Sequence, residues 1–212
     1  MDDTKQGKPM QKSRKTPNRT QLFEMASGQG GYFTAGQARS SGYGPALLSY
    51  HAKAGTYIRI RRGLYRYREY PSSPREDVIA AWLTLGKDVS VVSHESALDI
   101  LGLSNVIPNI IHIMVPRSKR NFTSRSGIKV HTTVKSIVKE DTVTRYGINV
   151  TSPARSILDA AESGVAPEQI EIAVRQAVTR GLATARQLRG KASERGKRVD
   201  KLITNALKKV KR

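Results

Sequence analysis

The order of hydrophobic periods in the first third of the chain constrains the fold more than any other feature. Thr34 and Gln37 have the spacing of a capping box, which predicts that a short helix begins there. A glycine turn at 42–44 separates this helix from a second one. Pro45, whose φ angle is fixed by its ring, suits the first position of that second helix, and Gly55 suits the position after its end. The sequence therefore predicts two short helices joined by a tight turn.

Directly after this helix pair the hydrophobic period changes from 3.6 to two. Residues alternate in character over 57–61 and again over 64–68, and Arg62-Gly63 lies between the two runs. Two such runs around an Xaa-Gly turn predict a β-hairpin. Helix, turn, helix and hairpin are the layout of a winged helix-turn-helix, in which the second helix enters the major groove and the wing follows the phosphates. A small α/β unit with merely solvated arginines is the alternative, but the clustering of arginine on the hairpin favours DNA binding.

The charge of the chain is distributed unevenly along the sequence. The formal net charge is +20 and the isoelectric point is about 10.5, which favours an anionic partner. Residues 1–75 carry 14 Lys or Arg and four Asp or Glu, residues 180–212 carry 12 and two, and the residues between them carry 11 of each. The basic charge therefore lies at both ends of the chain. Its excess at the C-terminal end predicts a second contact with DNA.

The composition also excludes several classes of site. The chain contains no cysteine, which excludes disulfides, thiolate metal sites and cysteine nucleophiles. No apolar run approaches the ~18 residues that a membrane span requires, and the N-terminus is polar rather than signal-like. We therefore expect a cytoplasmic protein with no membrane partner.

Composition and helix-start signals predict an α+β protein in three parts. Residues 1–16 are polar and lysine-rich and are expected to form a disordered basic arm. Residues 17–72 are expected to form the winged helix-turn-helix, with a first helix opened by Thr16 as N-cap and Pro17 at the first helical position. Residues 73–212 are expected to form a mixed α/β domain that ends in basic helices.

The C-terminal part alternates between strand and helix patterns. A helix is expected to begin at a capping box formed by Ser73-Pro74-Arg75-Glu76, with Pro74 at its first position. Strands are predicted at 89–92, 110–115, 128–134 and 146–150, and helices are predicted to begin at Ser93, at Ser152-Pro153 and at Pro167. The last helix, 199–210, has an apolar stripe and a lysine face. A helix of this length is only marginally stable alone in water, so its apolar stripe must pack against another surface. The dock could be its own domain, a second copy of the chain or an acidic partner.

Residues that could support catalysis are scarce. The chain has four histidines, and His94-Glu95 lacks the second histidine of a metalloprotease helix. His112 lies in an apolar strand, where a hydrogen-bonded core histidine is more common than a metal ligand. The segment around Gly190-Lys191 resembles a P-loop only superficially, and the aspartates show no close pairing for two-metal chemistry. We therefore expect no enzymatic activity, no cofactor and no metal site.

Several motifs, taken in their order along the chain, resemble the AbiEi-type antitoxins. They are Gly31 to Ala38 (GYFTAGQA), Ile58 to Tyr65 (IRIRRGLY), Ser93 to Leu98 (SHESAL), Ile111 to Pro116 (IHIMVP) and Val150 to Asp159 (VTSPARSILD). The resemblance covers roughly residues 20–180. It implies a winged helix-turn-helix that binds and represses the promoter of its own operon. It also implies a C-terminal domain that counters a nucleotidyltransferase-like toxin, directly or indirectly.

The resemblance further implies that Leu48 and Ala52 face the core of the winged unit. The opposite face of the second helix is then poor in the Arg, Asn and Gln side chains that make bidentate base contacts. We therefore expect the wing, the arm and DNA shape to carry more of the binding. The predicted DNA contacts are Thr34, Tyr43, Gly44, Ala46, Ser49, Tyr50, Lys53, Arg59, Arg61, Arg62 and Arg66. Accessory phosphate contacts are predicted at Lys12, Arg14, Lys15, Lys201, Lys208 and Lys209.

Other functions remain open at this point. RNA binding would use Tyr43, Tyr50 and Tyr57 as exposed stacking surfaces, whereas the wing favours duplex DNA. A nuclease acting on nucleic acid is a further alternative, as is a transcriptional regulator without a toxin partner. Self-association on DNA is compatible with each regulatory alternative.

Overall fold

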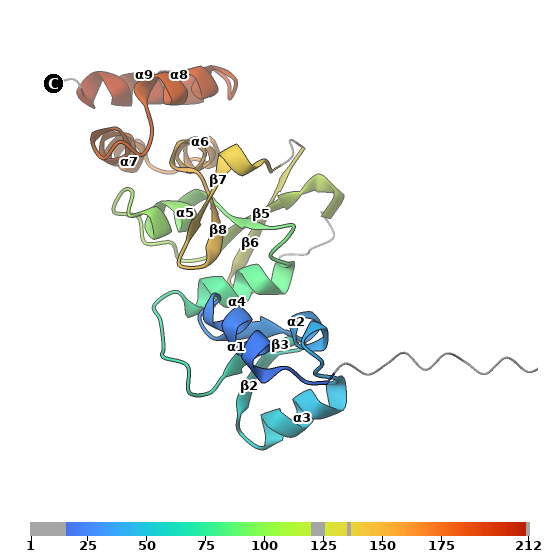
Figure 1. The fold of residues 1–212 in the computed structure, drawn as a ribbon. Coiled ribbons are helices and arrows are strands. Elements are labelled where there is room, and N and C mark those ends of the chain that lie inside the picture. Colours follow the sequence, from blue (N-terminus) through green and yellow to red (C-terminus); the bar gives the residue numbers. More distant parts are fainter. Residues whose placement is uncertain (1–15, 120–125, 135–136, 211–212) are drawn as a thin grey trace, which may run out of the picture.

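The computed structural model describes residues 16–119, 126–134 and 137–210, and it contains two sheets with helices packed around them (Figure 1). The N-terminal unit consists of α1 (Arg19–Ser27), β1 (Tyr32–Thr34), α2 (Ala35–Ser40), α3 (Pro45–Lys53), β2 (Tyr57–Arg61) and β3 (Leu64–Tyr67). Its strands are antiparallel in the order β1-β3-β2, so β3 is the middle strand. The predicted order of helix, turn, helix and hairpin is confirmed.

The first helix begins two residues later than the sequence predicts. Asn18, not Thr16, occupies the N-cap position, and its side-chain Oδ1 accepts a hydrogen bond from the backbone N–H of Gln21 at 2.9 Å. Asparagine is among the strongest N-cap residues, and here it lies one turn before the buried Leu22. The prediction of a Thr16 cap with Pro17 inside the helix is therefore wrong.

The C-terminal unit is a five-stranded mixed sheet with helices packed against it. Its elements are α4 (Glu76–Leu85), β4 (Val91–Val92), α5 (His94–Leu101), β5 (Ile111–Pro116), β6 (Ile128–Thr133), β7 (Thr142–Arg145), β8 (Ile148–Thr151), α6 (Pro153–Ser163), α7 (Pro167–Thr179), α8 (Ala185–Ser193) and α9 (Lys197–Val210). Short 3-10 turns lie at Arg117–Lys119 and Lys139–Asp141. The strand order is β6-β5-β4-β8-β7, with β5–β6 and β4–β8 parallel and the other two pairs antiparallel. The α+β class is confirmed, and β7 is a strand that the sequence did not predict.

Helix α4 joins the two units into one core. It lies between the two sheets (Figure 1), and most of its side chains are buried, among them those of Ile79 and Trp82. Tyr32 of β1 and Leu64 of β3 belong to the same apolar cluster as α4 and the five-stranded sheet. Relative motion of the two units would therefore expose apolar surface.

The start of α4 differs from the predicted capping box. The helix begins at Glu76, and Arg75 occupies the N-cap position without a side-chain hydrogen bond to the helix. One half of the box exists, because Glu76 Oε1 accepts a hydrogen bond from the backbone N–H of Ser73 at 3.0 Å. The Ser73 hydroxyl instead accepts from the Arg75 N–H at 3.2 Å, so Pro74 lies before the helix rather than at its first position.

The last helix docks on its own domain, which is the first of the three docks left open by the sequence. Val199, Ile203, Ala206 and Leu207 of α9 are buried against α7, α8 and α6, and they belong to the main core. This end of the molecule lies opposite α3 (Figure 1). Among the helices of the described ranges, none combines the length and the apolar content needed to cross a bilayer.

Candidate nucleic-acid interface and a buried histidine cluster

The start of α2 is fixed by the predicted capping box. Thr34 Oγ1 accepts a hydrogen bond from the Gln37 N–H at 3.2 Å, and Gln37 Oε1 accepts one from the Thr34 N–H at 2.8 Å. The buried Gln29 amide braces the same side chain, because Gln37 Nε2 donates to Gln29 Oε1 at 2.9 Å. Thr34 therefore positions α2 through its hydroxyl, and a DNA contact by this residue stays a prediction.

The turn between α2 and α3 is held by an aromatic side chain that faces inward. The Tyr43 N–H donates to the Ala38 carbonyl at 2.8 Å, and the Tyr43 ring is buried beside His51 and Tyr57. Its predicted role as a DNA contact is therefore wrong, because its ring fills the core of the winged unit. His51 is half-buried in the same aromatic group.

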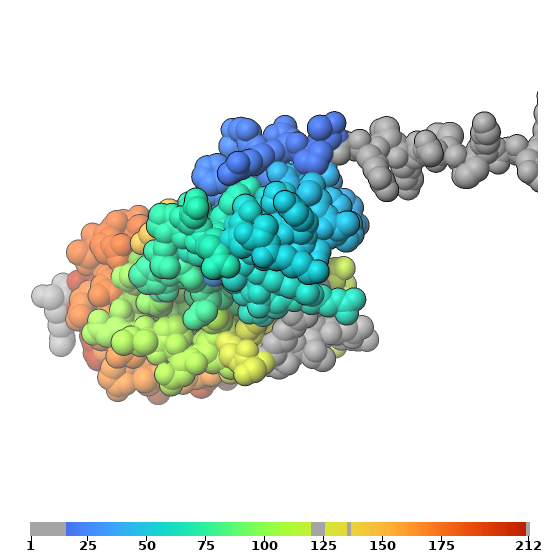
Figure 2. Space-filling model, turned by 90° about the horizontal axis from the view of Figure 1, so that it is seen from below, coloured from blue at the N-terminus to red at the C-terminus, as the bar shows by residue number. Residues whose placement is uncertain are grey.

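Helix α3 presents the predicted exposed face. Gly44 is its N-cap and Pro45 its first residue, while Leu48 is buried in the core of the winged unit. The side chains on the outer face are Ala46, Ser49, Tyr50 and Lys53, all of them exposed. Tyr50 is 64% exposed and is the largest of these. Seen from below, the α3 surface (cyan) faces the viewer and the C-terminal unit does not cover it (Figure 2).

The wing carries exposed cations beside this helix. Arg59 and Arg62 are exposed, Arg61 is half-buried, and Gly63 closes the turn with a φ of 78°, a conformation that favours glycine. The register of β2 against β3 shifts between Arg59 and Arg61, and Ile60 between them is 37% exposed. Arg19, Arg39 and Arg68 are further exposed cations of the winged unit.

Arg66 does not belong to this surface. It lies on the middle strand β3 and is 6% exposed, with its Nη2 2.8 Å from the Glu76 carboxylate. The same nitrogen donates to the Tyr70 and Pro71 carbonyls at 2.8 and 3.0 Å. Its predicted DNA contact is therefore wrong: Arg66 binds the wing to the start of α4 because the middle strand is covered on the α4 side.

The predicted accessory cations have different environments. Lys201 and Lys208 are exposed on α9, whereas Lys209 donates to the Glu171 carboxylate of α7 at 2.6 Å. Lys12, Arg14 and Lys15 lie outside the described residues. Their roles in DNA binding all remain predictions.

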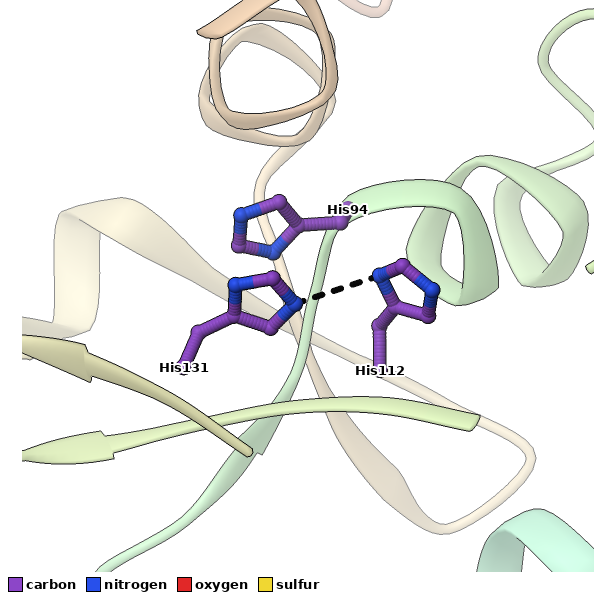
Figure 3. A group of neighbouring side chains, drawn as sticks. All are labelled: His94, His112 and His131. Atoms are coloured by element: carbon purple, nitrogen blue, oxygen red, sulfur yellow. Dashed lines mark hydrogen bonds between the residues drawn. The ribbon is translucent and has the colours of Figure 1, made fainter. Parts of the chain in front are cut away.

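Three of the four histidines meet inside the C-terminal unit (Figure 3). His94 is the first residue of α5, His112 lies on β5, and His131 lies on the neighbouring strand β6, where Met114 is its register partner. His131 Nε2 and His112 Nδ1 are 3.2 Å apart, and the rings of His94 and His131 stack with centroids 3.6 Å apart. The expectation that His112 is a buried strand residue is confirmed.

Burial keeps these imidazoles neutral. It lowers the pKa of His94 to about 2, and the neighbouring His131 and His112 add to this effect. Burial likewise lowers the pKa of His131 to about 4, with His112 and Lys129 adding to it. Burial also lowers the pKa of His112, although the Glu95 carboxylate acts in the opposite direction.

A cavity of about 490 Å³ opens beside His94 and His131, and its wall carries paired charges. Arg155 Nη1 donates to Asp141 at 2.7 Å, Lys191 Nζ donates to the other oxygen of Asp141 at 2.6 Å, and Arg195 lies 2.9 Å from Asp159. Burial alone would raise the pKa of Asp141, but Lys191 and Arg155 hold it below its usual value. These basic residues of α6, of α8 and of the turn after α8 are therefore neutralised within the domain.

The fold and the exposed surface of α3 and the wing define a winged helix-turn-helix protein with a second, mixed α/β unit. Residues 21–68 match the sequence model of the family described as transcriptional regulator, AbiEi antitoxin, which confirms the resemblance over the winged unit. The match covers the winged unit and none of the C-terminal unit.

Structural similarity extends beyond this segment. The chain resembles the crystal structure of the RV2827C protein from Mycobacterium tuberculosis, with a TM-score of 0.57 and 14% sequence identity, over 92% of this chain and 78% of that one. At this identity the likeness shows the fold alone. No curated protein sequence matches the chain.

The histidine cluster is the feature that sequence reasoning missed. His94, His112 and His131 are separated by 18 and 19 positions, which matches none of the short spacings of metal-binding motifs. The signal that could have found them is topological, since parallel pairing of β5 with β6 places His112 and His131 on adjacent strands.

Proposed function

We propose that this chain binds duplex DNA of its own promoter through α3 and the β2–β3 wing and represses transcription there. The observation that carries the proposal is the surface of the winged unit. Residues 16–72 carry eight Lys or Arg and two Asp or Glu, and six of the cations are exposed. Among the described residues, Arg66 is the only one of these eight cations whose side chain forms an ion pair with an acidic residue.

Phosphate contacts dominate the proposed interface. The outer face of α3 offers Ser49, Tyr50 and Lys53, which can reach the phosphate backbone but provide no bidentate base contact. Arg59 and Arg62 lie on the wing, the element that follows the backbone in this class of protein. We infer that the operator is recognised mainly through charge and DNA shape, so that binding depends strongly on salt.

The test compares two pairs of substitutions in the full-length protein. Arg59→Ala with Arg62→Ala should weaken binding to a duplex promoter fragment and flatten the plot of log K against log salt by about one unit per lost phosphate contact. The matched control is Arg186→Ala with Arg189→Ala, which removes the same charge from exposed positions of α8. Equal effects of the two pairs would show that net charge, not the wing, drives binding.

We further infer that residues 17–72 serve DNA binding and residues 73–212 counter a nucleotidyltransferase-like toxin. The shared core through α4 makes separate expression of the halves a poor test, because either half would expose apolar surface. The full-length double variant of Arg59 and Arg62 is the better reagent. It should lose repression of a promoter reporter yet still protect cells that express the nucleotidyltransferase-like toxin. Loss of protection together with repression would contradict this division of labour.

The chain is proposed to act by binding rather than catalysis. An RNA-binding role is less well supported than at the sequence level, since Tyr43 and Tyr57 are buried and only Tyr50 of the three tyrosines is exposed. Competition between a duplex promoter fragment and single-stranded RNA of the same sequence distinguishes the two roles. Preferential binding of the RNA would overturn the DNA proposal.

A further inference from the structure

Three imidazoles from three different elements converge in the C-terminal unit, at a distance from the proposed DNA surface. His94, His112 and His131 each offer one ring nitrogen, and these three nitrogens all lie within 4.8 Å of one another. Two of them, Nδ1 of His112 and Nε2 of His131, are 3.2 Å apart. Nitrogen ligands of a tetrahedral zinc ion, each about 2.0–2.1 Å from the metal, are about 3.3 Å apart. The distance between these two nitrogens therefore already matches the separation of two ligands in a tetrahedral zinc site.

Polar side chains lie close to one ring nitrogen in two of these histidines. Glu95 Oε2 lies 3.0 Å from Nε2 of His112, although without the alignment of a hydrogen bond, and so leaves Nδ1 of His112 facing His131. Ser93 Oγ lies 2.9 Å from Nδ1 of His94, so Nε2 of that ring can become a ligand only after the ring turns (Figure 3). A carboxylate or hydroxyl behind a ligating histidine is the usual support of a metal site.

We propose that His94, His112 and His131 bind one divalent transition metal ion, with zinc the best match, and that a further coordination position opens on the adjoining cavity. This proposal differs from the prediction made from the sequence, which was that the chain has no metal site. Binding requires the His94 ring to rotate out of its stack on His131, since stacked rings direct their nitrogens side by side rather than toward one point (Figure 3). His94 and His131 both line the cavity, so the open position faces it.

The donor set selects the class of metal. Three imidazole nitrogens suit zinc, copper, nickel or ferrous iron, whereas magnesium and calcium prefer oxygen ligands. Three histidines with one remaining position is also the ligand count of open zinc sites. The chain has no cysteine and one other histidine, His51, so competing nitrogen or sulfur sites are scarce.

The test uses full-length protein that has been dialysed against a chelator. Zinc chloride titrated in competition with a zinc indicator should report one tightly bound ion per chain. His131→Gln should lower the affinity by on the order of a hundredfold or more, because it removes a ligand. His51→Gln is the matched control: it removes the histidine of the winged unit, and its zinc affinity should equal that of the wild type.

Glu95 provides a test of positioning. Glu95→Gln should lower zinc affinity by about 10- to 100-fold while the stoichiometry stays at one, since the three ligands remain. Each variant must show the wild-type circular dichroism spectrum without metal. In the wild-type protein, the imidazole resonances of three of the four histidines should shift on addition of zinc, a measurement that needs no variant.

Two results would overturn the proposal. One is the absence of stoichiometric zinc binding by the wild-type protein, which would leave the cluster as a hydrogen-bonded part of the core. The other is equal affinity in the wild type and in His131→Gln, which would place the ion elsewhere. Because these measurements do not involve DNA, failure here would leave the DNA proposal untouched.

Discussion

Arg66 offers the sharpest separation between a structural and a DNA-binding arginine. Its side chain is 7% exposed and that of its partner Glu76 is 28% exposed, with 2.8 Å between Nη2 and Oε1. Arg66→Met keeps most of the aliphatic volume but removes the charge and the hydrogen bonds to the Tyr70 and Pro71 carbonyls. The Glu76 carboxylate then loses its cation in a partly buried site.

The expected loss follows from this geometry. Removing one partner of a buried ion pair typically costs about 3–5 kcal/mol, because the other charge stays buried. Glu76 is more than a quarter exposed, so water recovers part of that loss, and we expect the free energy of unfolding to fall by about 2–4 kcal/mol. Adding Glu76→Gln to Arg66→Met should restore part of the stability, because the unpaired carboxylate is then absent.

Urea unfolding and the salt dependence of DNA binding together show whether Arg66 has a structural role or contacts DNA. Arg66→Met should lower the urea midpoint and, under conditions where it is folded, leave the salt slope of DNA binding unchanged. The control Arg62→Met, at an exposed wing position, should do the reverse: its stability should stay within about 0.5 kcal/mol of the wild type while the salt slope flattens. A stable Arg66→Met variant with a flatter slope would refute the structural role and return Arg66 to the DNA surface.

Three further outcomes are expected. Gly147 has a φ of 73° and its Cα lies against the backbone of Gly28, so in Gly147→Ala the new methyl group would collide with the carbonyl oxygen of Gly28. The contact between the β7–β8 turn and the end of α1 should weaken, and thermal unfolding should show that the free energy of unfolding falls by about 1–2 kcal/mol or more. Ile203→Ala removes a fully buried side chain of α9 and should cost about 2–5 kcal/mol in urea unfolding. Because the pKa values of His94 and His131 are lowered in the folded chain, these side chains take up protons below about pH 6.5 only when the chain unfolds. The free energy of unfolding should therefore be highest above that pH. Toward pH 4 it should fall by about 1.4 kcal/mol per pH unit for each histidine. In His131→Gln the free energy of unfolding should fall less steeply with decreasing pH. An unchanged slope would contradict the lowered pKa of His131.

The winged unit could be predicted because its signals are local. The capping box at Thr34, the proline at the start of α3 and the change of period at the hairpin each act within a few residues. Arg66 could not be placed, because the alternation over 64–68 does not tell which strand will be central in the sheet. Its burial depends on β1 and on α4, which flank β3 from elsewhere in the chain.

The C-terminal unit was predicted less completely for a related reason. β7 is a short edge strand with Val143 as its one apolar residue, and its composition resembles a loop until β8 pairs with it. The histidine cluster depends on a parallel pairing between β5 and β6, and parallel strands are joined by long connections whose register no local pattern records. The parts of the site that need distant segments are those that sequence reasoning missed.

The basic C-terminal end needs a different interpretation from the one its composition suggests. The sequence predicts a second DNA contact there, but Lys191, Arg195 and Lys209 form ion pairs within the domain. The apolar stripe of α9 belongs to the main core, so truncation of this helix would unfold the domain rather than remove a surface. Since α9 lies at the end of the molecule opposite α3 (Figure 1), a duplex seated on α3 and the wing would have to curve around the protein to reach it. Substitution of the exposed Lys201 and Lys208 by Ala in the full-length protein therefore isolates the charge from the fold. Wild-type affinity and salt slope in that variant would assign DNA binding to the winged unit alone.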